Sequence, residues 1–344
     1  MKPLRILSGA VLAAAILFTA FFGANKISEK KSFAEEKPYK GVITVWQIDT
    51  FEGGTGSRKN FLLSAARGYE RKENGVLVMV ITHTEESAKE AFGKGETPDA
   101  VSYGTGFPVT GAKKLSIKGS SSEFSGGRIG DDVYAVPWCR GGYVLIENPS
   151  AKSERTGQTK SKTELPDLSE ETLLVSEGEH TAPLCAAALS GLKIKSAEIL
   201  SPMEAYVRFT EGKTRYFLGT QRDVVRLTRR ETSFKIYPLS GYNDLYQYIS
   251  LTSSSPEKSV YAERFIEYLL NESVQKTLGK ICMFSTLLKA EQESEALTEM
   301  QKICAASTVP FFIDGKSYAE LKALSHSAAT GNEKDLHKIK NFLA

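Results

Sequence analysis

The chain has 344 residues, with 44 Lys or Arg and 41 Asp or Glu, so its formal net charge is +3. Residues 1–34 hold five of the basic residues and one Glu, and without them the balance changes from +3 to −1. A nearly neutral domain gives no electrostatic argument for binding nucleic acid. The four cysteines are too widely spaced for a disulfide scaffold or a zinc site, and whether any pair is bridged stays open (Cys139, Cys185, Cys282 and Cys304).

The first segment has the pattern of an export signal. Lys2 and Arg5 precede an uncharged apolar run from Ile6 to Ala24, and a small-residue cleavage site follows at 32–34. The run is also about 19 residues long, enough to span a bilayer uncut. We expect residues 1–34 to be a signal peptide or an N-terminal membrane anchor. The remaining chain would then be extracytoplasmic, either secreted or anchored to the outer face of the cytoplasmic membrane.

Residues 41–58 predict a strand, a glycine-rich turn and the start of a helix. Asp49, Glu52 and Arg58 would project near the carboxyl end of this strand, where open α/β sheets bind ligands. A phosphate-binding loop does not fit, because no Lys-Ser/Thr pair follows the glycines. The dinucleotide fingerprint does not fit either, because Lys59 stands where its third glycine is needed. A helix cap with flexible glycines remains the alternative.

Strand and helix patterns then alternate. Residues 76–81 form a continuous apolar run, which is typical of a strand buried on both faces of a parallel sheet. After a short helix over 85–92, a second strand ends in another glycine turn at Ser102, Tyr103 and Gly104. Such repeats predict right-handed crossovers and a doubly wound sheet.

Two extended segments with Pro or Gly, 133–146 and 234–239, are candidates for crossings between two lobes. Residues 150–181 are polar and without a clear period, which predicts a surface connection or a shortened lobe edge rather than a core element. A strand over 214–220 leads into a helix whose first turn carries Arg222. The Arg fork suits carboxylates or sugar hydroxyls, and Arg222 is the arginine of this helix nearest the strand end.

The order of several motifs resembles the extracellular solute-binding proteins of bacterial ABC importers, the sugar-binding-protein-like group. The motifs are Val45-Trp46, Phe51-Glu52-Gly53-Gly54, Thr97-Pro98-Asp99-Ala100-Val101, Tyr134-Ala135-Val136-Pro137-Trp138, Phe217-Leu218-Gly219-Thr220, Tyr237-Pro238-Leu239-Ser240-Gly241 and an amphipathic helix over 265–275. The resemblance covers most of the chain after the export segment.

The resemblance implies an α/β fold, a two-lobed periplasmic-binding-protein-like (type II) clamshell in which each lobe is a doubly wound sheet with flanking helices. Lobe 1 would comprise residues 40–140 plus 239–290, and lobe 2 residues 141–238 plus 291–344. It also implies a monomer that binds a small polar solute, above all a carbohydrate, and delivers it to ABC transporter permease subunits. No cofactor or metal is expected, and an uncleaved N-terminal segment would attach the protein to the membrane.

The expected ligand-binding residues combine aromatic rings, charged groups and glycines at predicted turns and crossings. They are Trp46, Asp49, Glu52, Gly53, Gly54, Arg58, Ser102, Tyr103, Gly104, Trp138, Arg140, Tyr143, Arg222 and Tyr242. Aromatic faces stack on the C–H groups of sugar rings, while polar groups bond the hydroxyls. The alternative for about half of these aromatics is a place in the core.

Two other functions stay open. The first is a membrane-anchored ligand sensor with the same clamshell fold. The sequence does not distinguish this role from that of an importer subunit. Asp49 and Glu52 would alternatively be the carboxylate pair of a glycosidase. We expect no enzyme activity, because the sequence has no evident activated nucleophile or metal constellation.

Overall fold

The computed structural model describes residues 39–51, 57–117, 126–151, 165–287, 292, 294–309 and 315–343. The expected export segment, 1–34, lies outside the described residues, as do Glu52, Gly53 and Gly54. Residues 41–344 form one compact unit, separate from the first 40 residues. Within the described ranges, none of the helices is long and apolar enough to span a bilayer.

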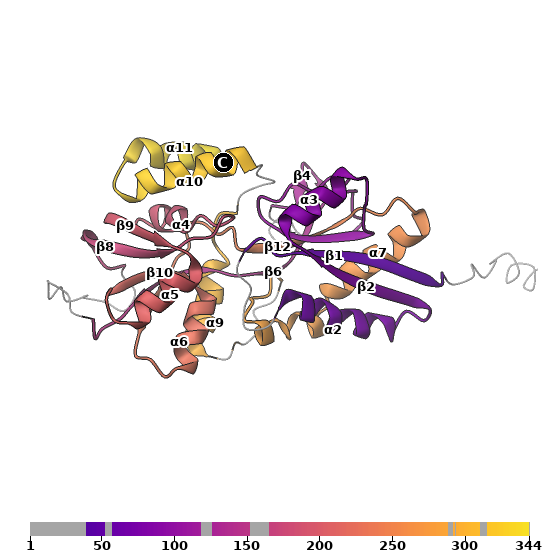
Figure 1. The fold of residues 1–344 in the computed structure, drawn as a ribbon, viewed down its shortest axis with the longest axis horizontal. Coiled ribbons are helices and arrows are strands. Elements are labelled where there is room, and N and C mark those ends of the chain that lie inside the picture. Colours follow the sequence, from indigo (N-terminus) through magenta and orange to yellow (C-terminus); the bar gives the residue numbers. More distant parts are fainter. Residues whose placement is uncertain are drawn as a thin grey trace, which may run out of the picture. The chain divides into compact units, whose positions relative to one another are not determined.

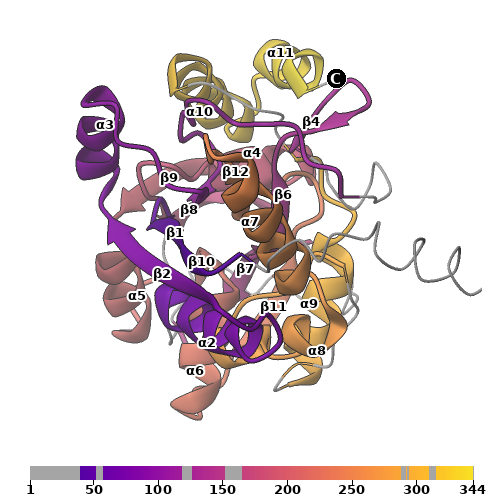
Figure 2. The ribbon, with the colours of Figure 1, turned by 90° about the vertical axis from the view of Figure 1, so that its right-hand side faces the viewer.

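The first sheet has five strands in the order β2-β1-β3-β12-β6. They are β1 (Gly41–Ile48), β2 (Val76–His83), β3 (Ala100–Gly104), β6 (Val136–Arg140) and β12 (Tyr246–Leu251). β1 runs parallel to β2 and β3, whereas β12 is antiparallel to β3 and β6. The flanking helices are α2 (Arg58–Glu70), α3 (Glu85–Gly93) and α7 (Pro256–Leu269). α2 and α3 lie on opposite sides of β2 (Figures 1 and 2).

The second sheet has the order β11-β7-β10-β8-β9. Its strands are β7 (Tyr143–Glu147), β8 (Leu168–Ser176), β9 (Ile194–Leu200), β10 (Tyr216–Thr220) and β11 (Lys235–Pro238). β8 is parallel to β9 and β10, and β7 is antiparallel to β10 and β11. Helices α4 (Pro183–Leu189), α5 (Pro202–Thr210), α6 (Gln221–Arg229) and α9 (Glu295–Cys304) surround it. Phe209, Phe217 and Met300 belong to its buried core.

The chain passes between the two sheets more than once. β6 leads into β7 through Gly141 and Gly142, and β11 leads back to β12 through 239–245. The short elements between them are β4 (Arg128–Ile129), β5 (Asp132–Val133), α8 (Glu272–Gln275) and the 3-10 helix η1 (Leu278–Ile281). The last helices, α10 (Gly315–Ala329) and α11 (Glu333–Leu343), pack together, and α10 packs on α4 (Figure 1).

This architecture confirms the predicted fold class, a two-lobed α/β clamshell with a sheet and flanking helices in each lobe. Both sheets are mixed rather than fully parallel. The residue boundaries given for the lobes stay a prediction. The four cysteines are buried and form no disulfide bonds with one another.

Two predictions about single segments were wrong. Residues 76–81 are not buried on both faces, because β2 is an edge strand on which Leu77 and Met79 are 57% and 48% exposed. Residues 150–181 are not only a surface connection, because β8 is an inner strand of the second sheet. Its apolar part is just three residues long, 173–175, and the polar residues before it are largely exposed. Pairing with β9 and β10 therefore forms this strand, rather than any strong hydrophobic pattern.

Candidate functional site

The ends of several strands and the starts of several helices converge between the two sheets. Ser57 caps α2 by accepting a hydrogen bond from the Asn60 backbone N–H at 3.0 Å. At the start of α6 the bond runs the other way, because the side chain of Asp223, the third helical residue, accepts from the backbone N–H of the capping residue Thr220 at 2.9 Å. Helix starts of this kind, following directly on strand ends, are where open α/β sheets place their ligands.

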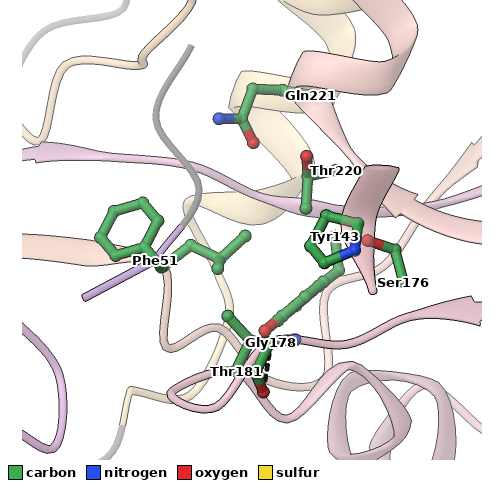
Figure 3. Close-up of a pocket in the computed structure, with 9 residues that line it drawn as sticks. Phe51, Tyr143, Ser176, Gly178, Thr181, Thr220 and Gln221 are labelled. Carbon is green, nitrogen blue, oxygen red and sulfur yellow. Dashed lines mark hydrogen bonds between the residues drawn. The ribbon is translucent and has the colours of Figure 1, made fainter. Parts of the chain in front are cut away.

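A first cavity lies here, which we call the neutral cavity, with a volume of about 20 Å³. It is lined by Phe51, Tyr143, Ser176, Gly178, Thr181, Pro202, Thr220, Gln221 and Leu245. Phe51, which follows β1, faces Tyr143 and Thr220 from the second sheet across the cavity (Figure 3). Among the described residues that line it none is charged, and this part of the wall offers aromatic, aliphatic, hydroxyl and amide groups.

A second cavity of about 460 Å³, the charged cavity, is lined by Glu85, Lys89, Gly106, Pro108, Glu179, His180, Tyr318, Ala319 and Lys322. The segment 176–182 takes part in both cavities, since Gly178 and Thr181 line the neutral one and Glu179 and His180 the charged one. The Thr181 hydroxyl accepts a hydrogen bond from the Gly178 backbone N–H at 2.7 Å, which closes the turn. We call this segment the partition.

Contacts across the charged cavity connect α3, which flanks the first sheet, with the partition and with α10. Glu85, in the first turn of α3, forms an ion pair with His180 of the partition. The Lys322 ammonium of α10 donates to the Gly178 carbonyl at 2.9 Å and lies 3.0 Å from a Glu177 carboxylate oxygen. Elements from the first sheet, the second sheet and the C-terminal helices thus meet around one cavity.

Of the expected ligand-binding residues in the described ranges, Tyr143 lines the neutral cavity and is 1% exposed. Asp49 and Arg58 form an ion pair with each other, and neither is among the residues that line this cavity. The Arg58 guanidinium is 1% exposed, donates from Nε to Asp49 Oδ1 at 3.0 Å and stacks 4.1 Å from the centre of the Phe51 ring. Arg58 therefore supports the Phe51 wall of the cavity from inside the protein.

Four other expected residues bond to protein atoms. Trp138 is fully buried, stacks on Phe61 at 5.2 Å and donates from Nε1 to Ser102 Oγ at 3.0 Å. The Tyr103 hydroxyl is 2.8 Å from the Ser250 hydroxyl. The Arg140 guanidinium donates to the Ser285 carbonyl at 3.2 Å and to the Gln301 carbonyl of α9 at 2.9 Å. These four side chains have internal contacts and are not among the residues that line either cavity.

The remaining expected residues lie elsewhere. Trp46 packs in the core below α3, with ring centres 4.4 Å from His83 and 5.0 Å from Phe92. A Cβ atom at Gly104 would stand 1.8 Å from Thr50 Oγ1, so this glycine allows a close approach of two segments. Arg222 is on the first turn of α6, next to the lining residue Gln221.

Tyr242 is buried beside Asp244, a wholly buried carboxylate between the crossings. Burial raises the pKa of Asp244, although hydrogen bonds from Tyr143 and Tyr318 act in the opposite direction. Burial and the nearby carboxylate also raise the pKa values of the three tyrosines well above their usual range (Tyr143, Tyr242 and Tyr318). These hydroxyls therefore stay protonated and act as hydrogen-bond donors.

Sequence reasoning missed most of the cavity walls. Ser176 and Thr181 were within a segment interpreted as a surface connection, and α10, which carries Tyr318 and Lys322, was not predicted at all. Gln221 had a usable signal, because it is the first helical residue after a strand, where backbone donors are free. Arg222 was expected to bind the ligand because of its charge, whereas the neighbouring Gln221 stands at the first helical position and lines the cavity.

No protein-family model matches the sequence, and no curated protein matches it either. Comparison of folds does give relatives among solved structures. The sugar-binding protein MalE from Xanthomonas citri has a TM-score of 0.60 at 14% identity, over 88% of this chain and 95% of that one. The chain has the fold of the two-lobed, MalE-type binding proteins.

Two further neighbours share this fold. The galacto-N-biose-/lacto-N-biose I-binding protein of an ABC transporter from Bifidobacterium longum has a TM-score of 0.57 at 13% identity, covering 88% of this chain and 98% of that one. Iron-bound HitA from Pseudomonas aeruginosa has a TM-score of 0.53 at 15% identity, covering 83% and 99%. The fold thus occurs with a sugar in one neighbour and with iron in another, so the ligand must be argued from the cavity walls.

Proposed function

We propose that this chain binds a small polar solute, specifically a carbohydrate, outside the cytoplasm and delivers it to the permease subunits of an ABC transporter. The neutral cavity carries this proposal. Phe51 and Tyr143 offer apolar ring surface, while Thr181, Thr220 and Gln221 offer hydroxyl and amide groups. A sugar needs both kinds of surface, because its C–H faces stack on rings and its hydroxyls exchange hydrogen bonds.

The charge of the cavity wall supports the same ligand class. The cavity volume is about 20 Å³ in this form, less than a sugar unit fills, so binding would require the walls to move apart. An isolated metal ion or a strongly charged solute would lie against uncharged groups there, at a large cost in desolvation. The fold of sugar-binding proteins of ABC transporters supports the proposal in addition.

The N-terminal sequence supports an extracytoplasmic place. Its basic start and uncharged run, 6–24, are features of a secretory signal or of a membrane anchor. The protein would act as a monomer, soluble after cleavage or attached through residues 1–34. Gene context distinguishes transport from a sensing role of the same clamshell, because two neighbouring genes for permease subunits would favour transport.

We also infer that the bound solute is not turned over. A carboxylate pair for glycoside hydrolysis needs two carboxyl groups flanking one bond. Asp49 is held by the buried Arg58, with their charged atoms 2.9 Å apart, and is not among the residues lining either cavity. Its suggested partner Glu52 is outside the described residues.

The test is a ligand screen by thermal shift, followed by calorimetric titration. The panel holds mono- and oligosaccharides, polyols, amino acids and ferric nitrilotriacetate. We expect one saccharide class to raise the Tm and to bind with a Kd near 1 μM, which corresponds to about 8 kcal/mol. Binding of ferric ion without any saccharide, or hydrolysis of a glycoside in the panel, would contradict the proposal.

A matched pair of serine variants locates the binding. Ser176→Ala removes a hydroxyl from the wall of the neutral cavity, and Ser196→Ala removes one from β9, outside both cavity linings. We expect Ser176→Ala to weaken binding by about three- to tenfold, the effect of one lost hydrogen bond, and Ser196→Ala to leave the Kd unchanged. Equal affinities of the two variants would place the solute elsewhere.

A further inference from the structure

Asp244 accepts four hydrogen bonds although its carboxylate is wholly buried. The Tyr143 hydroxyl donates to Oδ1 at 2.5 Å. The Tyr318 and Tyr242 hydroxyls donate to Oδ2 at 2.5 and 3.3 Å, and the Ala182 backbone N–H donates to Oδ2 at 2.8 Å. A buried carboxylate is costly to keep unless donors of this kind satisfy its oxygen atoms.

The donors come from different walls of the site. Tyr143 lines the neutral cavity and Tyr318 lines the charged cavity. Ala182 ends the partition between the two cavities. One carboxylate therefore holds a wall residue of each cavity together with the segment that separates them.

The backbone around Asp244 is itself fixed to other crossings. The neighbouring Asn243 donates from Nδ2 to the Gly141 carbonyl at 3.0 Å, and its backbone N–H donates to the Thr308 carbonyl at 2.9 Å. Asn243 Oδ1 accepts from the Leu245 backbone N–H at 3.1 Å. Because these bonds fix the chain on both sides, movement of one tyrosine on Asp244 is opposed by the others rather than absorbed by the backbone.

Stability alone gives no reason for this arrangement. A buried ionised group contributes little net stability compared with well-packed apolar residues of similar size, whereas it fixes the positions of its partners closely. The same fully satisfied set of hydrogen bonds makes each bond depend on the others.

We propose that Asp244 is a positioning residue for solute binding, which orients Tyr143 and Tyr318 and thereby couples the neutral cavity to the charged cavity. The inference rests on the proposed function, because it concerns the same cleft. A solute that contacts Tyr143 then restricts, through Asp244, where the ring of Tyr318 lies. The two cavities act as parts of one binding site rather than as independent ones.

The first test measures affinity for the saccharide found in the screen. Tyr318→Phe keeps the ring but loses the bond to Asp244, and Tyr69→Phe is its control, since it deletes a buried hydroxyl that donates to the Tyr261 carbonyl instead. We expect Tyr318→Phe to weaken binding by about five- to tenfold and Tyr69→Phe to change it less than twofold.

A double-mutant cycle separates positioning from direct contact. Asp244→Asn keeps the size of the side chain and weakens its acceptors. If Tyr318 acts through Asp244, the variant carrying both Asp244→Asn and Tyr318→Phe binds more tightly than the product of the two single effects predicts. Strictly multiplicative effects would overturn the proposal, since Tyr318 would then act on the solute by itself.

The second test needs no ligand. Hydrogen exchange of the backbone amides over 176–182 should become severalfold faster in Asp244→Asn and in Tyr318→Phe, but not in Tyr69→Phe. If no panel member binds the wild-type protein while exchange changes as expected, the proposed function fails and the positioning role stands. Unchanged exchange in both variants would overturn the positioning role, whatever the ligand.

Discussion

Arg58 is a buried charged residue that does not line the cavity but contacts a residue that does. Its guanidinium bonds Asp49 Oδ1 and the Phe51 carbonyl and stacks on the Phe51 ring. Arg58→Ala removes these contacts, and we expect a loss of about 2–4 kcal/mol in the free energy of unfolding. Binding should weaken as well, because Phe51 loses its support.

Arg67→Ala is the control, since Arg67 is an exposed residue of the same helix, α2. Its free energy of unfolding in urea should stay within about 0.5 kcal/mol of the wild-type value. If the two variants have the same free energy of unfolding, the contacts of Arg58 do not stabilise the protein, and the proposed support of Phe51 by Arg58 is refuted.

The pKa of Glu147 is shifted in the opposite direction from that of Asp244. Burial favours its neutral form, but hydrogen bonds from Arg215 and Tyr237 and the charge of Lys235 outweigh burial and hold the pKa of Glu147 below its usual value. A lowered pKa gives stability that is present above about pH 4.3, the unfolded value, and lost as the pH falls through the folded value.

We therefore expect Glu147→Gln to cost about 1–3 kcal/mol at pH 7 and progressively less below about pH 4. Glu170→Gln, at an exposed position of β8, should change the free energy of unfolding by less than about 0.5 kcal/mol. The measurement is urea unfolding over a range of pH. A cost of Glu147→Gln that does not shrink in acid would contradict the ion pair with Arg215.

At the scale of elements, β2 is the clearest departure from the hydrophobic pattern. Alternate residues of this edge strand are exposed, with Leu77 at 57% and Val78 at 7%. We expect Val78→Ala to cost roughly 2 kcal/mol and Leu77→Ser to stay within about 0.5 kcal/mol, measured by urea unfolding. A larger loss for Leu77→Ser would mean that both faces of β2 are covered.

The elements that sequence predicts well are those with a strong local pattern. α7 has an apolar stripe and a Ser255 cap, and β1 leads from an apolar run into the glycine turn. β8 has only a short apolar part, and α10 owes its place to contacts far along the chain, such as the bond of Tyr318 to Asp244. Such pairings over long sequence separations leave no periodic signal.

The same distinction applies to the site. The turn after β1 was expected to lie at a binding site, and Phe51 within it does line the neutral cavity. Aromatic and charged residues were then chosen by chemical type, but type does not separate a ligand contact from an internal one. Trp138 and Arg140 donate hydrogen bonds to protein atoms, which only the tertiary structure reveals.

At the scale of the whole molecule, the account requires the two lobes to close on a solute. The contact between the Glu85 carboxylate of α3 and the His180 ring of the partition joins elements from the two lobes, and it is an ion pair when His180 is protonated. Glu85→Gln removes the charge, so we expect a larger radius of gyration for the ligand-free protein and a several-fold weaker Kd. The measurements are small-angle scattering and calorimetric titration.

Glu90→Gln is the matched control, because Glu90 is an exposed residue of the same helix that pairs with Lys94 of the following turn. It should leave both the radius of gyration and the Kd unchanged. Identical scattering from the two variants, in the presence and absence of solute, would show that the Glu85–His180 pair has no part in closure.

The most direct test of the central claim is a crystal structure of the protein with the saccharide selected by the screen. The account predicts that the sugar lies between the two sheets, with its ring against Phe51 or Tyr143 and its hydroxyls bonded to Thr181, Thr220 or Gln221. A sugar bound on an outer face of either lobe, with the neutral cavity unchanged, would contradict it.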